Sequence, residues 1–335
     1  MAINKIVPSQ LKKPSAPGAG GASTTATAPT RDLSQVKLNL SPDLRMLLVG
    51  DTGAGKTTQI GELVEAQALE TGQPAVMFRM DKGGNLPILP HIQAGMLEEY
   101  AYDSDIDPWI WISLAVRGEA FVEKKWVKVT KDKCLAVYEG LTAFAEALMM
   151  DLAKIGANTP AQAVGGESAW QLTAKHGDET VEIAGSTMSH YGLVQLRIMN
   201  EIWATNPGVP SIWTAILARS TDVTGAGGIL GAMTTGKAQA AIVSRWYDYT
   251  FRLNSIPSET GEAKHILYLD THLDKQARGV KVIANARMPL GGSEAAPVDM
   301  RFEPADLVAA LRQLSLRQST AADELKARFD KARGR

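Results

Sequence analysis

The order of hydrophobic and polar positions divides the chain into short buried strands and amphipathic helices. Residues 45–49 form a nearly continuous apolar run, which is typical of a parallel strand buried on both faces. After a glycine-rich stretch, apolar residues recur at helical spacing from Ile60 to Leu69, and Gly72 is the expected end of that helix. A second apolar run follows at 75–80. The order strand, helix, strand predicts a βαβ unit, and therefore a parallel sheet covered by helices.

The rest of the pattern predicts a hairpin, further core strands and helices, and an insertion. The hairpin is expected over 109–130, with a turn near Gly118, because hydrophobic residues alternate there. Residues 156–188 read as an insertion with a small hairpin of its own around His176. The other expected elements are strands at 135–138, 211–217, 249–253, 266–269 and 280–284, and helices at 142–155, 191–205, 238–246, 304–314 and 320–332.

The two ends of the chain differ from its middle. Residues 1–38 are rich in Pro, Ala, Gly, Ser and Thr, so they cannot bury enough apolar surface to offset the entropy of ordering them. We interpret this stretch as a flexible, solubilising tail, with a weak anion-binding arm as the alternative. Residues 301–335 are expected to add C-terminal helices to the main domain.

Composition narrows the possible functions. The formal net charge of −1 gives no global attraction to nucleic acid or membranes, so a polyanionic partner has to be held by local charge. Cys134 is the only cysteine, which excludes a disulfide framework and a cysteine metal site. A metal cluster is not indicated by His265, Asp270, His272 and Asp274, because they lack metal-ligand spacing. We expect them to lie in a solvated loop. No apolar run approaches the roughly 20 residues of a membrane span, and the start lacks a signal-peptide core, so we expect a cytoplasmic protein.

The first strand and helix are joined by a complete phosphate-binding loop. Its glycines let backbone N–H groups point inward, and the following helix adds its positive end. The Lys56 ammonium can reach the β- and γ-phosphates, and the Thr57 hydroxyl can ligate Mg²⁺. The sequence therefore predicts ATP and Mg²⁺ as ligands. The expected contacts are Gly50, Asp51, Thr52, Gly53, Ala54, Gly55, Lys56, Thr57 and Thr58.

Beyond the loop, the stretch from Leu47 to Asp81 resembles the opening unit of the RecA-like ATPases. The resemblance implies that Asp81, at the end of the second strand, is the general base that activates the attacking water. Two acids are candidates for the metal side. Glu139 closes a strand in a pattern similar to the family's, with a small residue, Leu and Thr after it, whereas Asp270 closes a later strand with the commoner Asp. Order along the chain favours Glu139. Its side chain is longer than that of Asp and places the carboxylate differently toward Mg²⁺, so the expected hydrolysis is slow.

The segment after residues 211–217 resembles the glycine- and threonine-rich loop that holds single-stranded DNA in RecA-like recombinases. Backbone N–H groups of such a loop can bind phosphates without a large net charge. The family's polar sensor at the end of the preceding strand is not clearly present, and Arg219 or Ser220 would have to replace it. The implied DNA-binding residues are Gly225, Gly227, Gly228, Gly231, Thr234, Thr235, Gly236 and Lys237.

Residues 282–289 resemble the late segment through which RecA-like subunits reach the γ-phosphate of a neighbour. Arg287 fits the trans-acting cation, which would neutralise charge on the transferring phosphoryl group, and Asn285 replaces the family's companion lysine. The resemblance thus implies a homo-oligomer with ATP between subunits.

In total the resemblance runs from Leu38 to Pro289 and implies a RecA-like core over 39–300. The implied fold is α/β, with a mostly parallel central sheet flanked by helices and late antiparallel strands. The compact RecA-like ATPases of bacteriophages are the most similar group, which implies work on single-stranded DNA in recombination, annealing or replication in the host cytoplasm. Two alternatives stay open: a P-loop switch or loader that acts on protein partners, and a scaffold that binds nucleotide without hydrolysing it.

Overall fold

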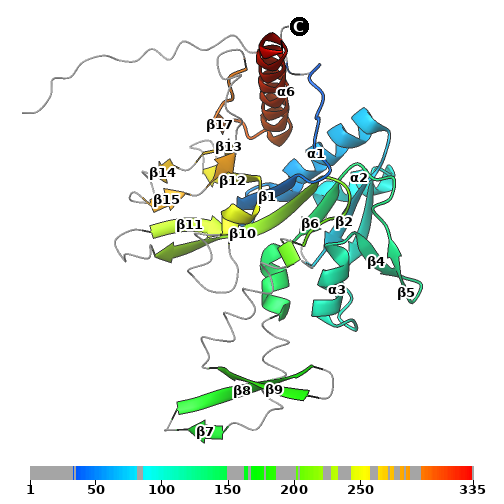
Figure 1. Cartoon of the computed structure of the whole chain (residues 1–335), viewed down its shortest axis with the longest axis vertical. Helices are drawn as coiled ribbons and strands as arrows, with labels where there is room; N and C mark the ends of the chain where they lie inside the picture. The colour runs from blue at the N-terminus through cyan, green and yellow to red at the C-terminus, as the bar shows by residue number, and fades with distance from the viewer. Residues whose placement is uncertain are drawn as a thin grey trace, which may run out of the picture. The chain divides into compact units, whose positions relative to one another are not determined.

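A mostly parallel sheet forms the centre of the molecule, in a computed structural model of the chain (Figure 1). The strand order is β3-β2-β6-β10-β1-β12-β13-β17; neighbours from β3 to β12 run parallel, and β13 and β17 are antiparallel. The structure describes residues 33, 35–80, 86–148, 162–164, 167–176, 179–185, 201–202, 204–221, 228–232, 243–256, 263–270, 272–274, 280–282, 284–286 and 296–333. The sheet strands are β3 (Leu97–Ala101), β2 (Ala75–Arg79), β6 (Ala136–Glu139), β10 (Ser211–Thr221), β1 (Arg45–Gly50), β12 (Tyr249–Ile256), β13 (Lys264–Tyr268) and β17 (Arg301–Phe302). The predicted fold class is therefore confirmed.

The expected opening unit is confirmed as well. Helix α1 (Lys56–Thr71) ends at Gly72, whose φ of 71° is the left-handed conformation that glycine adopts without strain. The Gly72 N–H donates to the carbonyl of Ala68 at 2.8 Å and so caps the helix. β1 is buried except at Arg45, because neighbouring strands and helices cover both of its faces.

Strand β3 is absent from the sequence predictions. It follows a short turn, η1 (Leu86–Ile88), and the helix α2 (Leu89–Gln93). The sequence does not indicate this strand, because it contains Glu98 and Glu99 and glutamate is uncommon in strands. In the structure Glu98 pairs with Lys133 and Glu99 pairs with Arg79, so both carboxylates are compensated at the sheet edge.

The prediction of a hairpin over 109–130 is wrong in its first half, where the chain forms helix α3 (Pro108–Ala115). Asp107 begins this helix, since its Oδ1 accepts hydrogen bonds from the backbone N–H of Trp109 at 2.8 Å and of Ile110 at 3.1 Å. Proline at the first helical position also favours a helix start. The alternation of Trp and Ile therefore lies on a partly buried helix, with Trp111 and Ile112 in the core. The hairpin itself consists of β4 (Glu119–Val122) and β5 (Lys125–Lys128), and it turns at residues 123–124.

The insertion contains the expected hairpin, formed by β8 (Glu167–His176) and β9 (Glu179–Gly185), with β7 (Gln162–Val164) paired to β8. Residues 141–148 are helical, as expected at the start of 142–155. Of the helix predicted at 191–205, only residues 201–202 are described as helical, and the rest lies mainly outside the described residues. Of the helix predicted at 238–246, the described part is the turn η3 (Val243–Trp246).

Part of the predicted glycine-rich loop is a strand. β11 (Gly228–Ala232) pairs antiparallel with the end of β10 and parallel with β15 (Val280–Val282). β14 (His272–Asp274) pairs antiparallel with β15, and β16 (Asn285–Ala286) pairs antiparallel with β12. The late strands that sequence placed at 249–253, 266–269 and 280–284 thus correspond to β12, β13 and β15.

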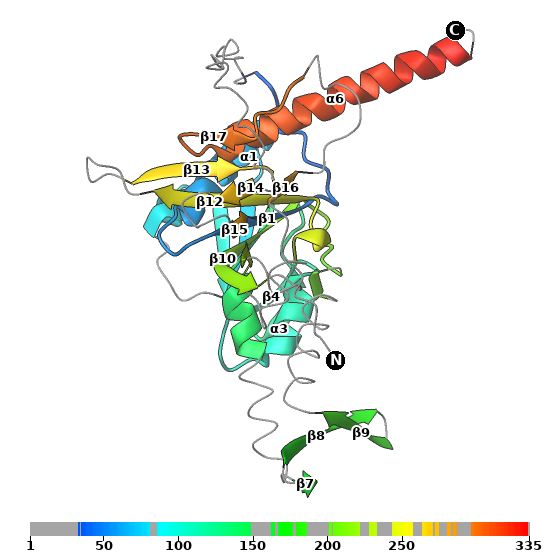
Figure 2. The same ribbon diagram turned by 90° about the vertical axis from the view of Figure 1, so that its left-hand side faces the viewer.

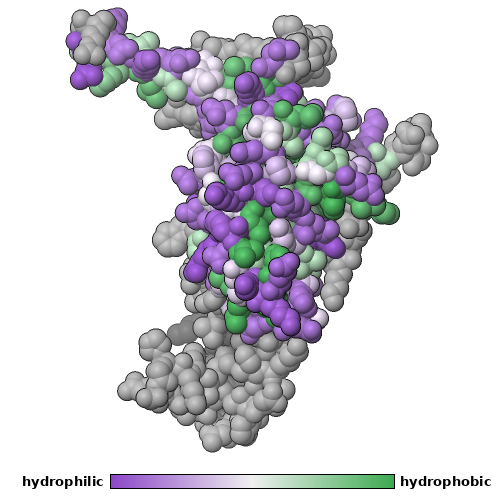
Figure 3. Space-filling view, turned by 90° about the vertical axis from the view of Figure 1, so that its right-hand side faces the viewer, coloured by the Kyte–Doolittle hydropathy of each residue, from purple (hydrophilic) through white to green (hydrophobic). Residues whose placement is uncertain are grey.

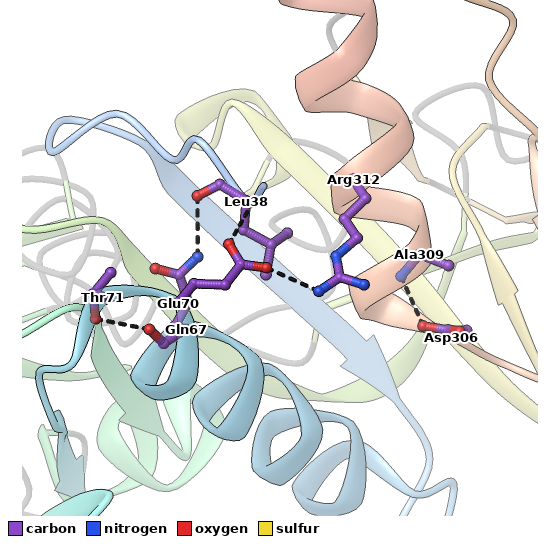
Figure 4. Close-up of polar contacts among 7 residues, drawn as sticks. All are labelled: Leu38, Gln67, Glu70, Thr71, Asp306, Ala309 and Arg312. Atoms are coloured by element: carbon purple, nitrogen blue, oxygen red, sulfur yellow. Dashed lines mark hydrogen bonds and ion pairs between the residues drawn. The ribbon is translucent and has the colours of Figure 1, made fainter. Parts of the chain in front are cut away.

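A single helix closes the chain instead of the two that were predicted: α6 runs from Leu307 to Ala332 without a break. It lies against α1, and Figure 4 shows Glu70 of α1 facing Arg312 of α6 at 2.8 Å. The other Glu70 oxygen accepts from the N–H of Leu38 at 2.7 Å. Leu38 is buried, so the end of the predicted tail belongs to the fold; residues 1–32 lie outside the described part.

Two hydrophobic cores lie on opposite faces of the sheet. One joins the sheet to α1 and α6, and the other joins it to α3 and residues 141–148. Figure 2 shows β12 and β13 side by side in this sheet. On the face in Figure 3, hydrophobic residues form small groups among hydrophilic ones. Among the described helices, none combines the length and the hydrophobicity that crossing a membrane requires.

Candidate nucleotide-binding site

Residues 51–55 form a tight loop between the carboxyl end of β1 and the start of α1. Gly53 and Gly55 have φ angles of 78° and 93°, which side chains other than glycine rarely adopt. Gly50 has to be small for another reason, because a Cβ there would lie 2.9 Å from the carbonyl oxygen of Leu253 on β12. The loop therefore combines left-handed glycines with a helix N-terminus, which is the arrangement that binds phosphate.

Lys56, the first residue of α1, lies folded over this loop. Its Nζ donates to the carbonyl oxygens of Gly50 at 2.9 Å and Asp51 at 3.0 Å. These contacts hold the ammonium at the mouth of the loop. A phosphate oxygen bound there would meet a positive charge that is already positioned.

Asp51 connects the loop to a buried arginine. Arg252 lies on β12 next to Val49 of β1, and its side chain is only 4% exposed. Its Nη2 is 3.7 Å from Oδ2 of Asp51, whose own side chain is more than half exposed. This ion pair ties the outer part of the loop to the sheet.

Glu139 lies beside the loop although it is 82 residues away from Thr57 in sequence. The Thr57 hydroxyl donates to Oε1 of Glu139 at 3.0 Å. β6, β10 and β1 are parallel neighbours, so their carboxyl ends meet at the same edge of the sheet. The structure thus brings together two residues that sequence reasoning had assigned to the metal.

Asp270, the other candidate, lies away from the phosphate-binding loop. β13 runs antiparallel to β12, so it begins near the loop and ends away from it. Leu267 pairs with Leu253, which in turn lies beside Gly50. Asp270 follows Leu267 by three residues, or about 10 Å of extended chain in the direction away from the loop. The geometry therefore leaves Glu139 as the acid next to the phosphate-binding loop.

The pair of oxygens fits Mg²⁺. Two neighbouring ligands of an octahedral Mg²⁺ ion, each at about 2.0–2.1 Å, lie roughly 2.9 Å apart. The Thr57 and Glu139 oxygens are 3.0 Å apart. Among the described residues there is no cluster of three or more His, Cys, Asp or Glu that could hold a metal by itself. This suits Mg²⁺, which usually takes one or two protein ligands together with phosphate oxygens and water.

A cavity of about 490 Å³ opens beside this pair, and we call it the phosphate cavity. Sequence reasoning missed several of its walls. Thr214 on β10 accepts a hydrogen bond from the Gly140 N–H at 3.0 Å, and Thr142 accepts one from the Ile216 N–H at 3.1 Å. The available signal was a polar residue inside the apolar run of β10. Residues from four segments line the cavity: Thr52, Gly53, Gly55, Lys56, Thr57, Thr58, Pro87, Glu139, Gly140, Thr142, Ala143, Glu146, Thr214, Ala215 and Ile216.

These two hydrogen bonds fix the turn that carries Glu139. Gly140 has a φ of 98°, so this position again favours glycine. Directly before the acid, Tyr138 stacks on Trp213 of β10 with ring centroids 4.4 Å apart. Burial raises the pKa of Tyr138 far above its ordinary value, so the phenol stays neutral and acts in packing. The end of β6 is therefore held from both sides.

Several predicted site residues lie outside the described residues. They include Asp81 and Arg287, so the structure does not relate the proposed base or the proposed trans-acting cation to the loop. The same holds for Gly225, Gly227, Thr234, Thr235, Gly236 and Lys237 of the predicted DNA loop.

Gly228 and Gly231 are described, and they lie in strand β11 rather than in a loop. In the register with β10, Gly231 pairs with Ala218 and Gly228 with Thr221. Arg219 and Ser220, the suggested sensor residues, belong to the same paired stretch of β10. The described part of the glycine-rich segment is thus an extension of the sheet.

Taken together, the fold and the site define a RecA-like P-loop arrangement. The phosphate-binding loop follows the central strand β1, and the acid ends β6, with β10 between these two strands. Helices cover both faces, and antiparallel strands come late in the chain.

The sequence was compared with protein families and curated proteins, and the fold with solved structures. No protein-family model matches the sequence, and no curated protein matches it. Among solved structures, a KaiC-like protein from the hyperthermophilic archaeon Pyrococcus horikoshii is similar, with a TM-score of 0.32 and 12% sequence identity. The match covers 67% of this chain and 77% of the archaeal chain.

Proposed function

We propose that this protein is an ATPase that binds Mg-ATP on the loop from Gly50 to Thr58. The observation that carries the proposal is the 3.0 Å contact between Thr57 and Glu139, next to a loop built for phosphate. Bound Mg²⁺ would neutralise charge that develops on the phosphates in phosphoryl transfer. Thr57 and Glu139 would hold that ion, and Lys56 would stabilise the β- and γ-phosphates.

The remaining catalytic roles rest on the resemblance of the sequence to RecA-like ATPases. Asp81 is proposed to take a proton from the attacking water. Arg287 of a neighbouring subunit is proposed to complete the site in a homo-oligomer, as a cation on the transferring phosphoryl group. Both roles predict residues whose replacement stops turnover without preventing ATP binding.

We further propose that the ATPase acts on single-stranded DNA, in recombination, annealing or replication in a phage-infected cell. The support is the glycine- and threonine-rich composition between Gly225 and Lys237. Because Gly228 and Gly231 lie in β11, the segments on either side of this strand are the better candidates for DNA contacts. A switch or loader that acts on proteins, or a scaffold without hydrolysis, remains the alternative function.

One experiment separates these functions: ATP turnover with Mg²⁺, measured with and without single-stranded DNA. Stimulation by DNA supports the DNA-dependent ATPase. Turnover without stimulation favours the protein-directed switch, and ATP binding without turnover favours the scaffold. A protein that binds no ATP would contradict the proposal as a whole.

A further inference from the structure

A second cavity, of about 540 Å³, lies on the other side of the phosphate-binding loop. It shares Gly55 and Thr58 with the phosphate cavity, so the two cavities meet at the start of α1. We call it the acidic cavity, after its two glutamates. Its lining comes from the loop and α1, from the start of β13 and from the segment before α6: Ala54, Gly55, Thr58, Gln59, Glu62, Leu253, Ala263, Lys264, His265, Glu303, Pro304 and Ala305.

The direction of a bound nucleotide follows from the geometry of the loop. Lys56, Thr57 and Glu139 mark the end where the γ-phosphate and Mg²⁺ belong, and all three line the phosphate cavity. Backbone N–H groups at the start of α1 hold the phosphates closer to the nucleoside. The chain of phosphates would therefore leave the phosphate cavity past Thr58, and the acidic cavity begins there.

The charges in the acidic cavity suit an uncharged group better than a further phosphate. Glu62 and Glu303 both line it. The one lysine in the lining, Lys264, lies 3.8 Å from Glu303 and is offset by it. A base and its sugar carry no charge, but they offer N–H and O–H donors to carboxylate oxygens. A volume of this size is also typical of small-molecule sites.

The side chain of Glu62 is positioned by a neighbour and can accept a hydrogen bond from such a group. Gln59, one turn earlier on α1, donates from Nε2 to Oε2 of Glu62 at 2.8 Å, and Glu62 lines the cavity. Burial, followed by the nearby charge of Asp306, raises the pKa of Glu62 above its ordinary value. Glu62 is an exposed residue, so a donor from a bound nucleoside can reach its carboxylate.

Gln59 also ties the cavity to the C-terminal helix. Its Oε1 accepts from the backbone N–H of Leu307 at 2.7 Å, and its Nε2 lies 3.2 Å from the carbonyl oxygen of Ala305. The wall formed by Pro304 and Ala305 is thus held in place by the residue that also positions Glu62. Both the wall and the recognition group depend on one side chain.

We propose that the acidic cavity holds the base and sugar of the nucleotide, and that Glu62 accepts a hydrogen bond from this nucleoside. The inference rests on the proposed function, because it assumes that the phosphates lie on the loop. It makes Glu62 a residue that determines affinity for the nucleoside, and it makes the segment before α6 part of the nucleotide site.

The test compares ATP with inorganic tripolyphosphate, which lacks the nucleoside, by calorimetric titration in the presence of Mg²⁺. We expect the unmodified protein to bind ATP about tenfold or more tightly than tripolyphosphate. Ala263→Trp, which fills the cavity from an exposed position, should lower the affinity for ATP to that for tripolyphosphate. Glu62→Ala should lower the affinity for ATP about fivefold. Neither change should alter the affinity for tripolyphosphate, and Leu69→Trp on an exposed part of α1 serves as the control.

A second readout needs no substitution. ATP, but not tripolyphosphate, should slow amide hydrogen exchange in the segment 303–307, because only ATP would contact this wall. The inference would be overturned, while the proposed function stands, if Ala263→Trp and Glu62→Ala both kept the affinity for ATP. An equal decrease in the affinities for ATP and tripolyphosphate would overturn it too. Equal binding of ATP and tripolyphosphate by the unmodified protein would overturn it as well. If neither ligand binds the unmodified protein, the proposed function fails and the inference fails with it.

Discussion

The two cavities beside the phosphate-binding loop differ in how they are built. The phosphate cavity is formed by the phosphate-binding loop and the start of α1, together with β6, β10 and the residues after β6, and hydrogen bonds such as Thr57 to Glu139 fix its groups. The acidic cavity has only one side in common with it, and its far wall is a segment before α6 that Gln59 holds in place. This difference indicates that the two cavities have different roles. The sheet edge provides the phosphate chemistry, and a late segment of the chain provides the contacts that would set affinity for the rest of the nucleotide.

The largest expected effect is on the phosphate side, from Lys56→Ala. Removing a charged donor that is already positioned over the loop should lower ATP turnover about 100-fold or more. It should also weaken binding of ATP and tripolyphosphate alike, because both present phosphates to this site. Steady-state turnover and titration with both ligands measure this. Lys124→Ala on the exposed turn of the hairpin is the matched control, and equal activity of the Lys56 variant would refute the phosphate site.

Glu139→Gln should reduce turnover by a similar factor, about 100-fold, but for a different reason. The amide keeps the shape of the side chain and removes the negative charge that would face Mg²⁺. ATP binding without Mg²⁺ should therefore be retained. Asp270→Asn is the matched control, since Asp270 follows β13, which runs away from the phosphate-binding loop. If Asp270→Asn abolished turnover and Glu139→Gln did not, the assignment of the two acids would be reversed.

Gln59→Ala tests the link between the acidic cavity and α6. It leaves the N–H of the buried Leu307 without its acceptor, so the free energy of unfolding should fall by about 1–3 kcal/mol. Denaturant titration measures this fall, with Gln73→Ala in the exposed turn after α1 as the control. ATP affinity should decrease while tripolyphosphate affinity is kept. An equal decrease for both ligands would show that the two cavities do not differ as described.

The smallest effect is expected at Asp107, which lines neither cavity. Asp107→Ala removes the cap of α3 and should lower the free energy of unfolding by about 1 kcal/mol. The affinities for ATP and tripolyphosphate should not change. Thermal unfolding and titration of the same variant check both statements, and a change in either affinity would mean that α3 contributes to the site.

The same contrast explains how much of the structure the sequence could predict. The phosphate-binding loop is a local pattern, so its residues are identified from spacing alone. Glu139 could be chosen over Asp270 because the order of segments along the chain resembles that of the RecA-like ATPases. Thr214 was missed, since its role depends on which neighbour its hydroxyl meets, the N–H of Gly140.

The acidic cavity could not be predicted in this way. Its lining joins α1, residues 263–265 and residues 303–305, which only the tertiary fold brings together. The errors in secondary structure have similar causes. β3 carries glutamates that look unsuited to a strand until their partners Arg79 and Lys133 are known. The alternation at 109–112 looked like a strand, but Asp107 and Pro108 start a helix there.

The central claim is that Thr57 and Glu139 hold Mg²⁺ beside a phosphate-binding loop. The most direct measurement is the Mg²⁺ dependence of ATP turnover in the unmodified protein and in Glu139→Gln. We predict turnover that requires Mg²⁺ in the unmodified protein, and a loss of about 100-fold in the variant at saturating ATP. Equal turnover by the two proteins over the whole range of Mg²⁺ concentrations would contradict the claim.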